Sequence, residues 1–231
     1  MINKAFATNS FPPSFKEGRI TLLCKDMKKV SYIRAWRPIT LVNTDYKLVT
    51  KMIANRIHDS LFDVSDTQMA NIYGRSAELS LISLSNIIHW TSTTQHSGAV
   101  VFIDSEKAFD RVDHVYMLNC LKKANVHHEL ITKIDTLYKD CSSRIIINGY
   151  VSKPIRIERG VRQGCPHSAA LFIITMEPFL QIIKRLVPPM SLPALGKVVP
   201  TFAFADDVNV VLDSVEHIPN VLEALYGIPL K

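Results

Sequence analysis

The chain has 231 residues, a mass of 26.0 kDa and 47% hydrophobic residues, enough for a packed core in one large domain or two smaller ones. A net charge of +6 and a pI near 9.1 favour a polyanionic partner. The longest apolar stretch, residues 169–176, is far too short to span a bilayer, and the four scattered cysteines contain no Cys-x-x-Cys pair, which argues against a zinc knuckle or a disulfide framework. We therefore expect no membrane contact and an intracellular location, cytoplasmic and/or nuclear, with reduced thiols.

Strands and helices are expected in irregular order along the first half of the chain. Residues 19–23 are predicted to form a strand after a proline-rich breaker. Residues 45–62 carry apolar side chains at helical spacing, and residues 76–90 do the same after Ser76, a helix N-cap. Residues 100–103 are an apolar run without helical period, which is typical of a buried strand.

The second half of the chain mixes helices with hairpins. Two helices are predicted at residues 115–124 and 129–140, and an antiparallel hairpin at residues 144–157, where an Asn-Gly pair marks the turn. A long helix is predicted at residues 168–186, and four prolines then make residues 188–200 an irregular connection. Strands interleaved with helices and hairpins, without a regular βαβ rhythm, indicate an α+β fold with a mixed or antiparallel sheet.

Two adjacent acids between two apolar runs are the most informative feature of the chain. Residues 202–205 and 208–211 are short β-prone runs, so the sequence predicts a hairpin with Asp206 and Asp207 in its tight turn. Carboxylates flanked by buried strands are costly unless a cation neutralises them, and Mg²⁺ prefers oxygen ligands. Taken alone, an Asp-Asp turn is more often ordinary solvated turn chemistry.

A third carboxylate strengthens the prediction of a metal site. Asp104 stands at the end of the apolar strand of residues 100–103, and it shares a site with Asp206 only if the two strands are neighbours in one sheet. Two Mg²⁺ ions about 3.5–4 Å apart, bridged by such carboxylates, stabilise in-line phosphoryl transfer. Asp110 and Asp113 end no apolar strand, and we interpret them as helix-start or surface acids.

Seven motifs in order resemble the reverse transcriptase domain of non-LTR (LINE-type) retrotransposons over about residues 11–213. They are Trp36-Arg37-Pro38-Ile39-Thr40-Leu41, Asp45-Tyr46-Lys47, Ala54-Asn55-Arg56, Gly74-Arg75, Asp104 with Lys107-Ala108-Phe109-Asp110, Gly160-Val161-Arg162-Gln163-Gly164-Cys165-Pro166 and Phe204-Ala205-Asp206-Asp207. The resemblance implies a right-hand polymerase, with fingers in residues 1–95, a palm with an antiparallel sheet in residues 96–231, and no thumb.

The same resemblance assigns the chemistry. Asp104, Asp206 and Asp207 match the metal-binding triad of the family, with Asp206 the more direct ligand of the adjacent pair. The triad implies two Mg²⁺ ions, or Mn²⁺ in their place, and an RNA template, a DNA primer and dNTPs as partners. The implied reaction is attack of the primer 3′-hydroxyl on the α-phosphate of a dNTP, with pyrophosphate leaving.

Several further residues match positions that handle substrate in the family. Phe109 matches the steric gate that excludes a 2′-hydroxyl, with ordinary core packing as the alternative. Gln163 and Gly164 match the motif that contacts the incoming nucleotide and template, although a glycine needed only for turn geometry is an alternative. Lys25 and Arg37 are candidates for the triphosphate, because a guanidinium binds phosphate oxygens bidentately, and solvated basic side chains are the alternative.

Two arginines match the family pattern, and several other positions depart from it. Arg75 and Arg162 are candidates for nucleic-acid contact, Arg75 through the template backbone. Ala70-Asn71 replaces the usual Gly-Phe after Gln68, and His167 lies within a motif that is normally Pro-Leu-Ser-Pro. These departures and the short segment after the acidic hairpin predict a truncated, diverged copy, so a catalytically silent nucleic-acid-binding remnant is the alternative function. A group II intron or bacterial retroelement polymerase fits the motifs less well.

Overall fold

The computed structural model describes residues 2–8, 11–58, 61, 64–192, 196–198 and 200–226. The chain forms two compact units, one of Met1–Ser60 with Phe109–Phe172 and the other of Leu61–Ala108 with Ile173–Lys231. Each unit is therefore built from two separate stretches of sequence. The division into fingers at residues 1–95 and palm at residues 96–231 stays a prediction.

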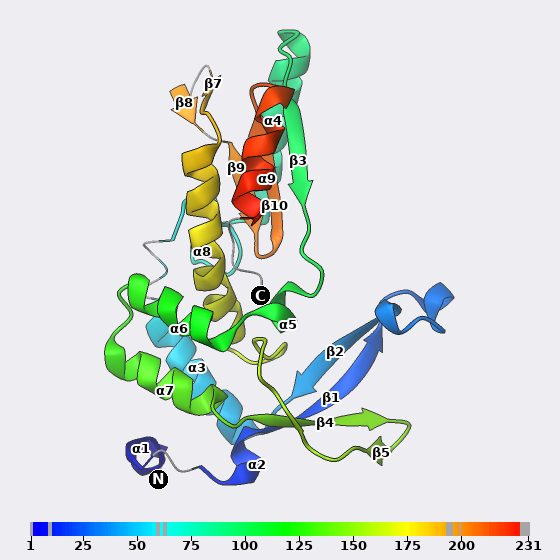
Figure 1. The fold of residues 1–231 in the computed structure, drawn as a ribbon, viewed down its shortest axis with the longest axis vertical. Coiled ribbons are helices and arrows are strands. Elements are labelled where there is room, and N and C mark those ends of the chain that lie inside the picture. Colours follow the sequence, from blue (N-terminus) through cyan, green and yellow to red (C-terminus); the bar gives the residue numbers. More distant parts are fainter. Residues whose placement is uncertain are drawn as a thin grey trace. The chain divides into compact units, whose positions relative to one another are not determined.

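The first unit is built on a five-stranded mixed sheet, seen in the lower part of Figure 1. The strands follow the order β2-β1-β4-β5, with β6 paired to β4, and β1 pairs antiparallel with β2 and parallel with β4. Asn148 (φ 50°) and Gly149 (φ 82°) form the turn between β4 and β5, which confirms the predicted Asn-Gly hairpin. The strand bounds are β1 Glu17–Cys24, β2 Trp36–Leu41, β4 Ser142–Ile147, β5 Tyr150–Val151 and β6 Ile155–Arg156.

Helices supply the rest of the first unit's core. Asp113 caps the helix α6 by accepting a hydrogen bond from the Tyr116 amide at 2.9 Å, as expected for a helix-start acid. Tyr46, Met117 and Leu137 are fully buried and come from three different helices. The bounds are α1 Ile2–Ala7, α2 Pro13–Lys16, η1 Met27–Lys29, η2 Ile33–Ala35, α3 Thr44–His58, α5 Ala108–Arg111, α6 His114–Lys123 and α7 His128–Tyr138.

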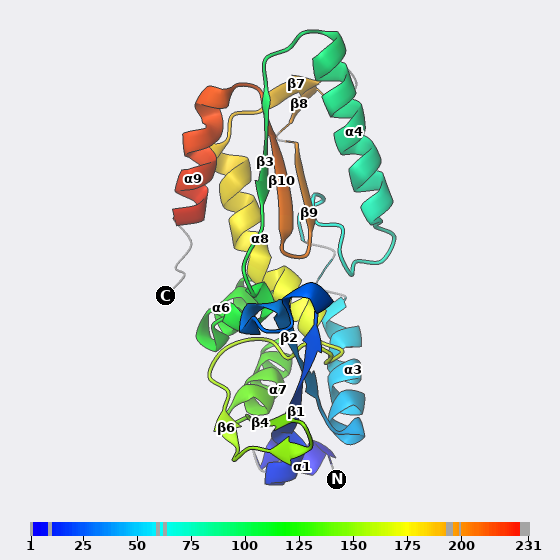
Figure 2. The same ribbon diagram turned by 90° about the vertical axis from the view of Figure 1, so that its right-hand side faces the viewer.

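The second unit contains the acidic hairpin in an antiparallel three-stranded sheet. Figure 2 shows the strands side by side in the order β3-β10-β9, which are Ala99–Ile103, Asp207–Leu212 and Thr201–Phe204. The predicted strand at residues 100–103 and its pairing with the acidic hairpin are thus confirmed. The helices of this unit are α4 Ala77–Thr93, α8 Ser168–Leu186, whose first residues to Phe172 belong to the first unit, η4 Val215–His217 and α9 Ile218–Tyr226.

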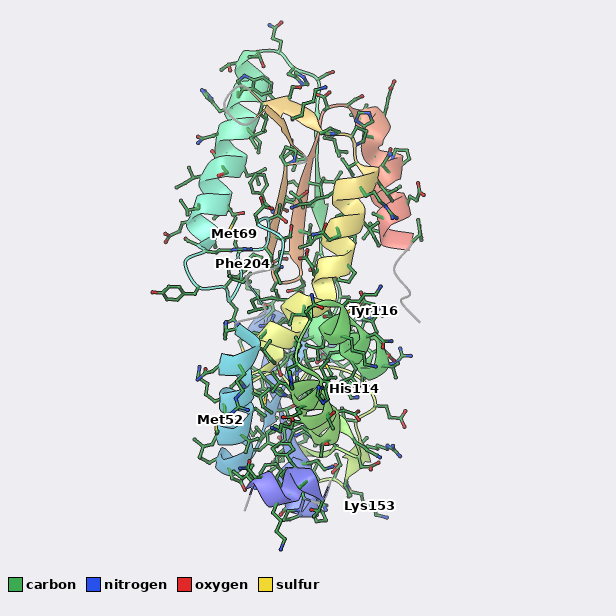
Figure 3. All side chains as sticks on the ribbon, turned by 90° about the vertical axis from the view of Figure 1, so that its left-hand side faces the viewer. Met52, Met69, His114, Tyr116, Lys153 and Phe204 are labelled. Atoms are coloured by element: carbon green, nitrogen blue, oxygen red, sulfur yellow. The ribbon has the colours of Figure 1, made fainter. Side chains whose placement is uncertain are left out.

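Strand alternation gives the three-stranded sheet two different faces. Val208, Val210 and Leu212 point to a core formed with α8 and α9, where each buried aliphatic side chain contributes about 1.5–3 kcal/mol. The other face packs Val211 against α4. Near the hairpin turn this second face is open, since Phe102 is 70% exposed and Phe204, labelled in Figure 3, is 48% exposed.

Two predictions of local structure need correction or adjustment. The proline-rich segment is not wholly irregular, because Met190–Leu192 (β7) and Gly196–Val198 (β8) pair antiparallel within it. The predicted helix at residues 45–62 ends at His58, and residues 59, 60 and 62 lie outside the described part. The helix predicted at residues 168–186 is confirmed at both ends.

Over the described residues, no helix is both long enough and apolar enough to cross a membrane.

Candidate active site

The acidic hairpin closes through a two-residue turn of Ala205 and Asp206. Phe204 pairs with Asp207, so Asp207 is the first residue of β10 and the prediction that it lies in the turn is wrong. The reason is that a ladder is formed by backbone groups, which pair whatever the polarity of the side chain. Of the two turn residues only Ala205 has a positive φ, at 55°, the pattern of a type II′ turn.

Asp104 and Asp207 lie one step beyond the last pair of the β3–β10 ladder. That pair is Ile103 of β3 with Val208 of β10, and the next residues toward the turn on the two segments are Asp104 and Asp207. Asp104 and Asp207 are both exposed, whereas Asp206 in the turn is half-buried. These carboxylates come from two strand ends and one turn of a single sheet.

The donor chemistry of these acids suits a hard divalent cation. Within the described part of the chain, no three His, Cys, Asp or Glu side chains gather into a group that could hold a metal ion. A preformed protein cage is not what Mg²⁺ requires, because it is usually bound through one or two carboxylates with waters and substrate phosphates completing the shell. The residues therefore fit Mg²⁺ through their oxygen donors, and joint ligation by all three acids stays a prediction.

A second group of predicted site residues meets in the first unit. The Val161 amide donates to the Phe109 carbonyl at 2.8 Å, and the Gln163 side-chain amide donates to Asp110 Oδ1 at 3.2 Å. The Phe109 ring stacks on Phe172, with ring centroids 4.2 Å apart and an interplanar angle of 10°. The sequence predicts Asp110 as a helix-start or surface acid, and it lies in the first turn of α5. Its bond to Gln163, which joins positions 53 residues apart, was missed.

Two glycines shape the chain around Gln163. Gly164 has a φ of 94°, and a Cβ at this position would lie 3.4 Å from the carbonyl oxygen of Thr40 in β2. Gly160 has a φ of 90°, and a Cβ there would lie 2.9 Å from the Asp110 carbonyl oxygen. Both positions use a left-handed conformation that favours glycine, so the turn-geometry alternative for Gly164 has a structural basis alongside the predicted substrate contact.

The two candidates for triphosphate binding lie on one face of the β1–β2 hairpin. Leu23 pairs with Arg37, and the Lys25 amide donates to the Ala35 carbonyl at 2.8 Å, one step beyond the last strand pair. This register makes Lys25 and Arg37 diagonal neighbours, a spacing of about 7–8 Å between backbones. Both side chains are exposed, as a phosphate ligand requires.

The side chains of Arg75 and Arg162, predicted to contact nucleic acid, bind backbone carbonyls of the chain itself. Arg162 is only 4% exposed, and its guanidinium donates to the carbonyls of Lys16 and Ser142 and lies 5.1 Å from the centroid of the Tyr46 ring. Arg75 donates to the carbonyls of Ser65, Gln68 and Val64. Each guanidinium donates to backbone oxygens of the fold, and Arg162 does so through Nη2, its Nε and Nη1 being buried with no hydrogen-bond partner in the described part of the chain. These contacts favour roles in holding the fold.

The unusual His167 is a buried core residue of the first unit. It is fully buried, and its Nδ1 lies 3.1 Å from the Cys165 sulfur, which in turn contacts the Thr50 hydroxyl at 3.3 Å. Burial lowers the pKa of His167 to about 3 and, for the same reason, raises the pKa of the Cys165 thiol. The imidazole is therefore neutral at physiological pH.

Comparison with known proteins gives a consistent result. The family model described as reverse transcriptase (RNA-dependent DNA polymerase) matches residues 26–227. A 149 kDa protein of transposon TX1 from Xenopus laevis is 32% identical over 212 residues, which are 91% of this chain and 16% of that protein. A Pol polyprotein from the type-1 retrotransposable element R2 of Popillia japonica is 25% identical over 217 residues, 91% of this chain and 29% of that protein. The chain thus spans less than a third of these relatives.

Solved structures show the same fold. Telomerase from Candida tropicalis in complex with a telomeric RNA fragment superposes with a TM-score of 0.65 at 11% identity, covering 99% of this chain and 42% of the telomerase. A form of the apo enzyme truncated from its C-terminal domain gives 0.64 at 13% identity, covering 96% and 48%. The mixed α+β fold of this chain is therefore similar to that of these telomerases. By family model and by relatives, the chain belongs to the reverse transcriptases, among the domains of non-LTR retrotransposon proteins.

Proposed function

We propose that this chain is an RNA-directed DNA polymerase domain that adds dNTPs to the 3′-hydroxyl of a DNA primer on an RNA template. The observation that supports the proposal is that Asp104 directly follows β3 while Asp207 begins the neighbouring strand β10, next to the Asp206 turn, in a chain of the reverse transcriptase family. Carboxylates at adjacent strand ends are the arrangement needed for metal-assisted phosphoryl transfer.

Asp104, Asp206 and Asp207 would hold two Mg²⁺ ions, or Mn²⁺ in their place. Bound divalent ions lower the pKa of the attacking hydroxyl and neutralise charge on the leaving oxygens. The contribution of the chain's own residues is position: two strand ends and a turn of one hydrogen-bonded sheet hold the carboxylates. Position matters because a misplacement of about 1 Å can cost on the order of 10²-fold in rate.

The first unit would supply the selection of the nucleotide. Lys25 and Arg37, exposed on one hairpin face, are proposed to contact the triphosphate. Phe109 is proposed to lie under the sugar and exclude a 2′-hydroxyl, and its stacking on Phe172 supports a fixed ring orientation. Gln163, tied to Asp110, and Gly164 are proposed to contact the nucleotide and the template.

The proposal places the protein with its template RNA and primer DNA in the cytoplasm and/or nucleus. A single addition is the appropriate assay, because it does not depend on repeated gripping of the product duplex.

The test is single-turnover addition of one dNTP to a DNA primer annealed to RNA, with the protein in excess and Mg²⁺ or Mn²⁺ present. The native chain is expected to extend the primer, and Asp206→Asn is expected to abolish the addition while template affinity, measured by fluorescence anisotropy, changes little. Template binding without addition by the native chain would contradict the proposal and identify the alternative, a silent nucleic-acid-binding remnant.

A further inference from the structure

A buried glutamine is bonded to the backbone of the acidic turn. Gln68 is fully buried, and its Oε1 accepts hydrogen bonds from the amides of Ala205 and Ala70, both at 3.0 Å. Its Nε2 donates to the Ala205 carbonyl at 3.3 Å. One side-chain amide therefore pairs with both backbone groups of Ala205, the residue immediately before Asp206.

The loop that carries Gln68 is held to the edge of the sheet. The Met69 amide donates to the Ala203 carbonyl at 2.8 Å, and the Ala203 amide donates to the Thr67 carbonyl at 2.9 Å, so Gln68 forms a parallel bridge with Ala203 of β9. Figure 3 shows Met69 of this loop near Phe204 at the end of β9. Because β9 is the edge strand of β3-β10-β9, the loop also covers an otherwise open edge.

Further bonds brace the same loop from behind. Arg75 donates to the Gln68 carbonyl at 2.8 Å and also to the carbonyls of Ser65 and Val64. The Ser65 amide donates to Glu177 of α8 at 3.0 Å, and Lys184 of α8 bonds Asp66 at 2.7 Å. The loop is thus a fixed support, and Gln68 is the side chain that extends from it to the turn.

The turn needs such a support because its backbone is strained. The first position of a type II′ turn favours glycine, and here it is Ala205 with a φ of 55°. A sparsely populated backbone conformation of this kind costs a residue with a Cβ on the order of 1–3 kcal/mol. Pairing both the amide and the carbonyl of Ala205 fixes the two peptide planes on either side of it, and hence the direction of the following Cα–Cβ bond.

We infer that Gln68 is a positioning residue that orients Asp206 for metal binding through the backbone of Ala205. The inference rests on the proposed function, since it presumes that Asp206 is a metal ligand. Gln68 touches neither substrate nor metal in this role. Partners that orient a metal ligand typically change metal affinity by about 10–100-fold when they are removed.

The experiment measures the affinity of the 231-residue chain for Mn²⁺ by electron paramagnetic resonance, together with its Tm. Gln68→Met conserves volume and removes all three hydrogen bonds of the amide. Val221→Ala, on α9 in the core of the same unit, is the control for general destabilisation. Asp206→Asn reports loss of the ligand itself, and Gln68→Met with Ala205→Gly tests whether a turn that needs no support restores binding.

We expect Gln68→Met to weaken Mn²⁺ binding by about 10-fold or more, the added Ala205→Gly to recover part of it, and Val221→Ala to lower only the Tm. If Gln68→Met fails to fold, Arg75→Lys, which weakens the brace, is expected to reduce affinity by a smaller factor. If Asp206→Asn weakens Mn²⁺ binding but Gln68→Met binds Mn²⁺ with native affinity, the positioning role alone is overturned. Where Gln68→Met does not fold, native affinity in Arg75→Lys has the same meaning. Native affinity in Asp206→Asn would overturn the proposed function and this inference together.

Discussion

At the scale of the residue, Phe109 carries the sharpest statement about substrate choice. Its ring is half-buried and stacks on the buried Phe172, so packing accounts for one of its faces. A gate requires the remaining ring surface to exclude a hydroxyl, which is a separate property from packing. The two roles are separated by comparing deoxy- and ribonucleotides.

We predict that Phe109→Val admits ribonucleotides, lowering the ratio of kcat/KM for dNTP over rNTP by about tenfold or more, because the volume under the sugar is enlarged. Single-nucleotide addition with each substrate provides the measurement. Phe172→Leu is the control, since it removes the stacking partner and leaves the Phe109 ring in place. Equal losses for both nucleotides in Phe109→Val would make Phe109 a packing residue only.

A second residue-scale prediction concerns His167 and pH. Its pKa in the folded chain is about 3, below the value of 6.5 in the unfolded chain, so the unfolded state binds more protons between these values. Its contribution to stability is full above pH 6.5 and falls as the pH decreases through that window, at up to about 1.4 kcal/mol per pH unit.

We expect the Tm of the native chain to fall more steeply between pH 7 and pH 5 than the Tm of the His167→Gln variant, because glutamine does not bind a proton in this range. Because both proteins keep every carboxylate, the difference between the two curves isolates the histidine. Parallel curves would show that His167 is not buried as a neutral group.

At the scale of the element, predictions succeeded where the determining signals are local. Ser76 caps α4 by accepting from the Glu78 amide at 3.1 Å, and α8 has the bounds that its apolar period indicated. The sequence predicts the turn one residue late, because the pairing of Phe204 with Asp207 is made by backbone groups whatever their side chains. The burial of Arg162 gives no local signal, because its partners Lys16 and Ser142 are distant in sequence.

The candidate site also contains residues that local sequence could predict and residues that it could not. The acids and Phe109 stood out because each follows a recognisable strand or motif. Gln68 was noted only for the residues after it, and its bonds to Ala205 cross 137 positions of sequence, so no local pattern could predict them. The partnership of Gln163 with Asp110 was missed for the same reason.

An element-scale prediction compares two glycines with similar backbone. Gly160 and Gly149 have φ values of 90° and 82°, so a Cβ strains both by about 1–2 kcal/mol. A Cβ at Gly160 also meets the Asp110 carbonyl oxygen at 2.9 Å, whereas nothing lies within 4 Å at Gly149. Gly160→Ala is therefore expected to lower the Tm clearly more than Gly149→Ala, by a further ~1–3 kcal/mol in stability. Similar losses of Tm in Gly160→Ala and Gly149→Ala would contradict this, and would mean that the backbone of α5 shifts away from the added Cβ at little cost.

At the scale of the whole molecule, the net charge of +6 predicts RNA affinity that depends on salt. Lys28 and Lys29 are exposed in the connection between β1 and β2, beside the strongly exposed Met27 and Ile33. We predict that replacing both lysines with alanine weakens binding to single-stranded RNA and reduces the salt slope by about 0.7 for each lost phosphate contact.

Fluorescence anisotropy at several salt concentrations measures this slope. Lys122 and Lys123 on α6 are a matched pair, adjacent and exposed, whose replacement removes the same charge. An equal effect of the two double replacements would indicate attraction by total charge without a defined path for RNA.

The central claim, that this domain copies RNA into DNA at its acidic hairpin, is tested most directly by varying one templating base. Four RNA templates that differ only at this base are offered with each dNTP under single-turnover conditions with Mg²⁺. The account predicts that the native chain adds the complementary dNTP to each template, and that Asp104→Asn and Asp206→Asn add none while still binding the template. Addition that ignores the templating base, or that persists at the native rate in Asp206→Asn, would contradict it.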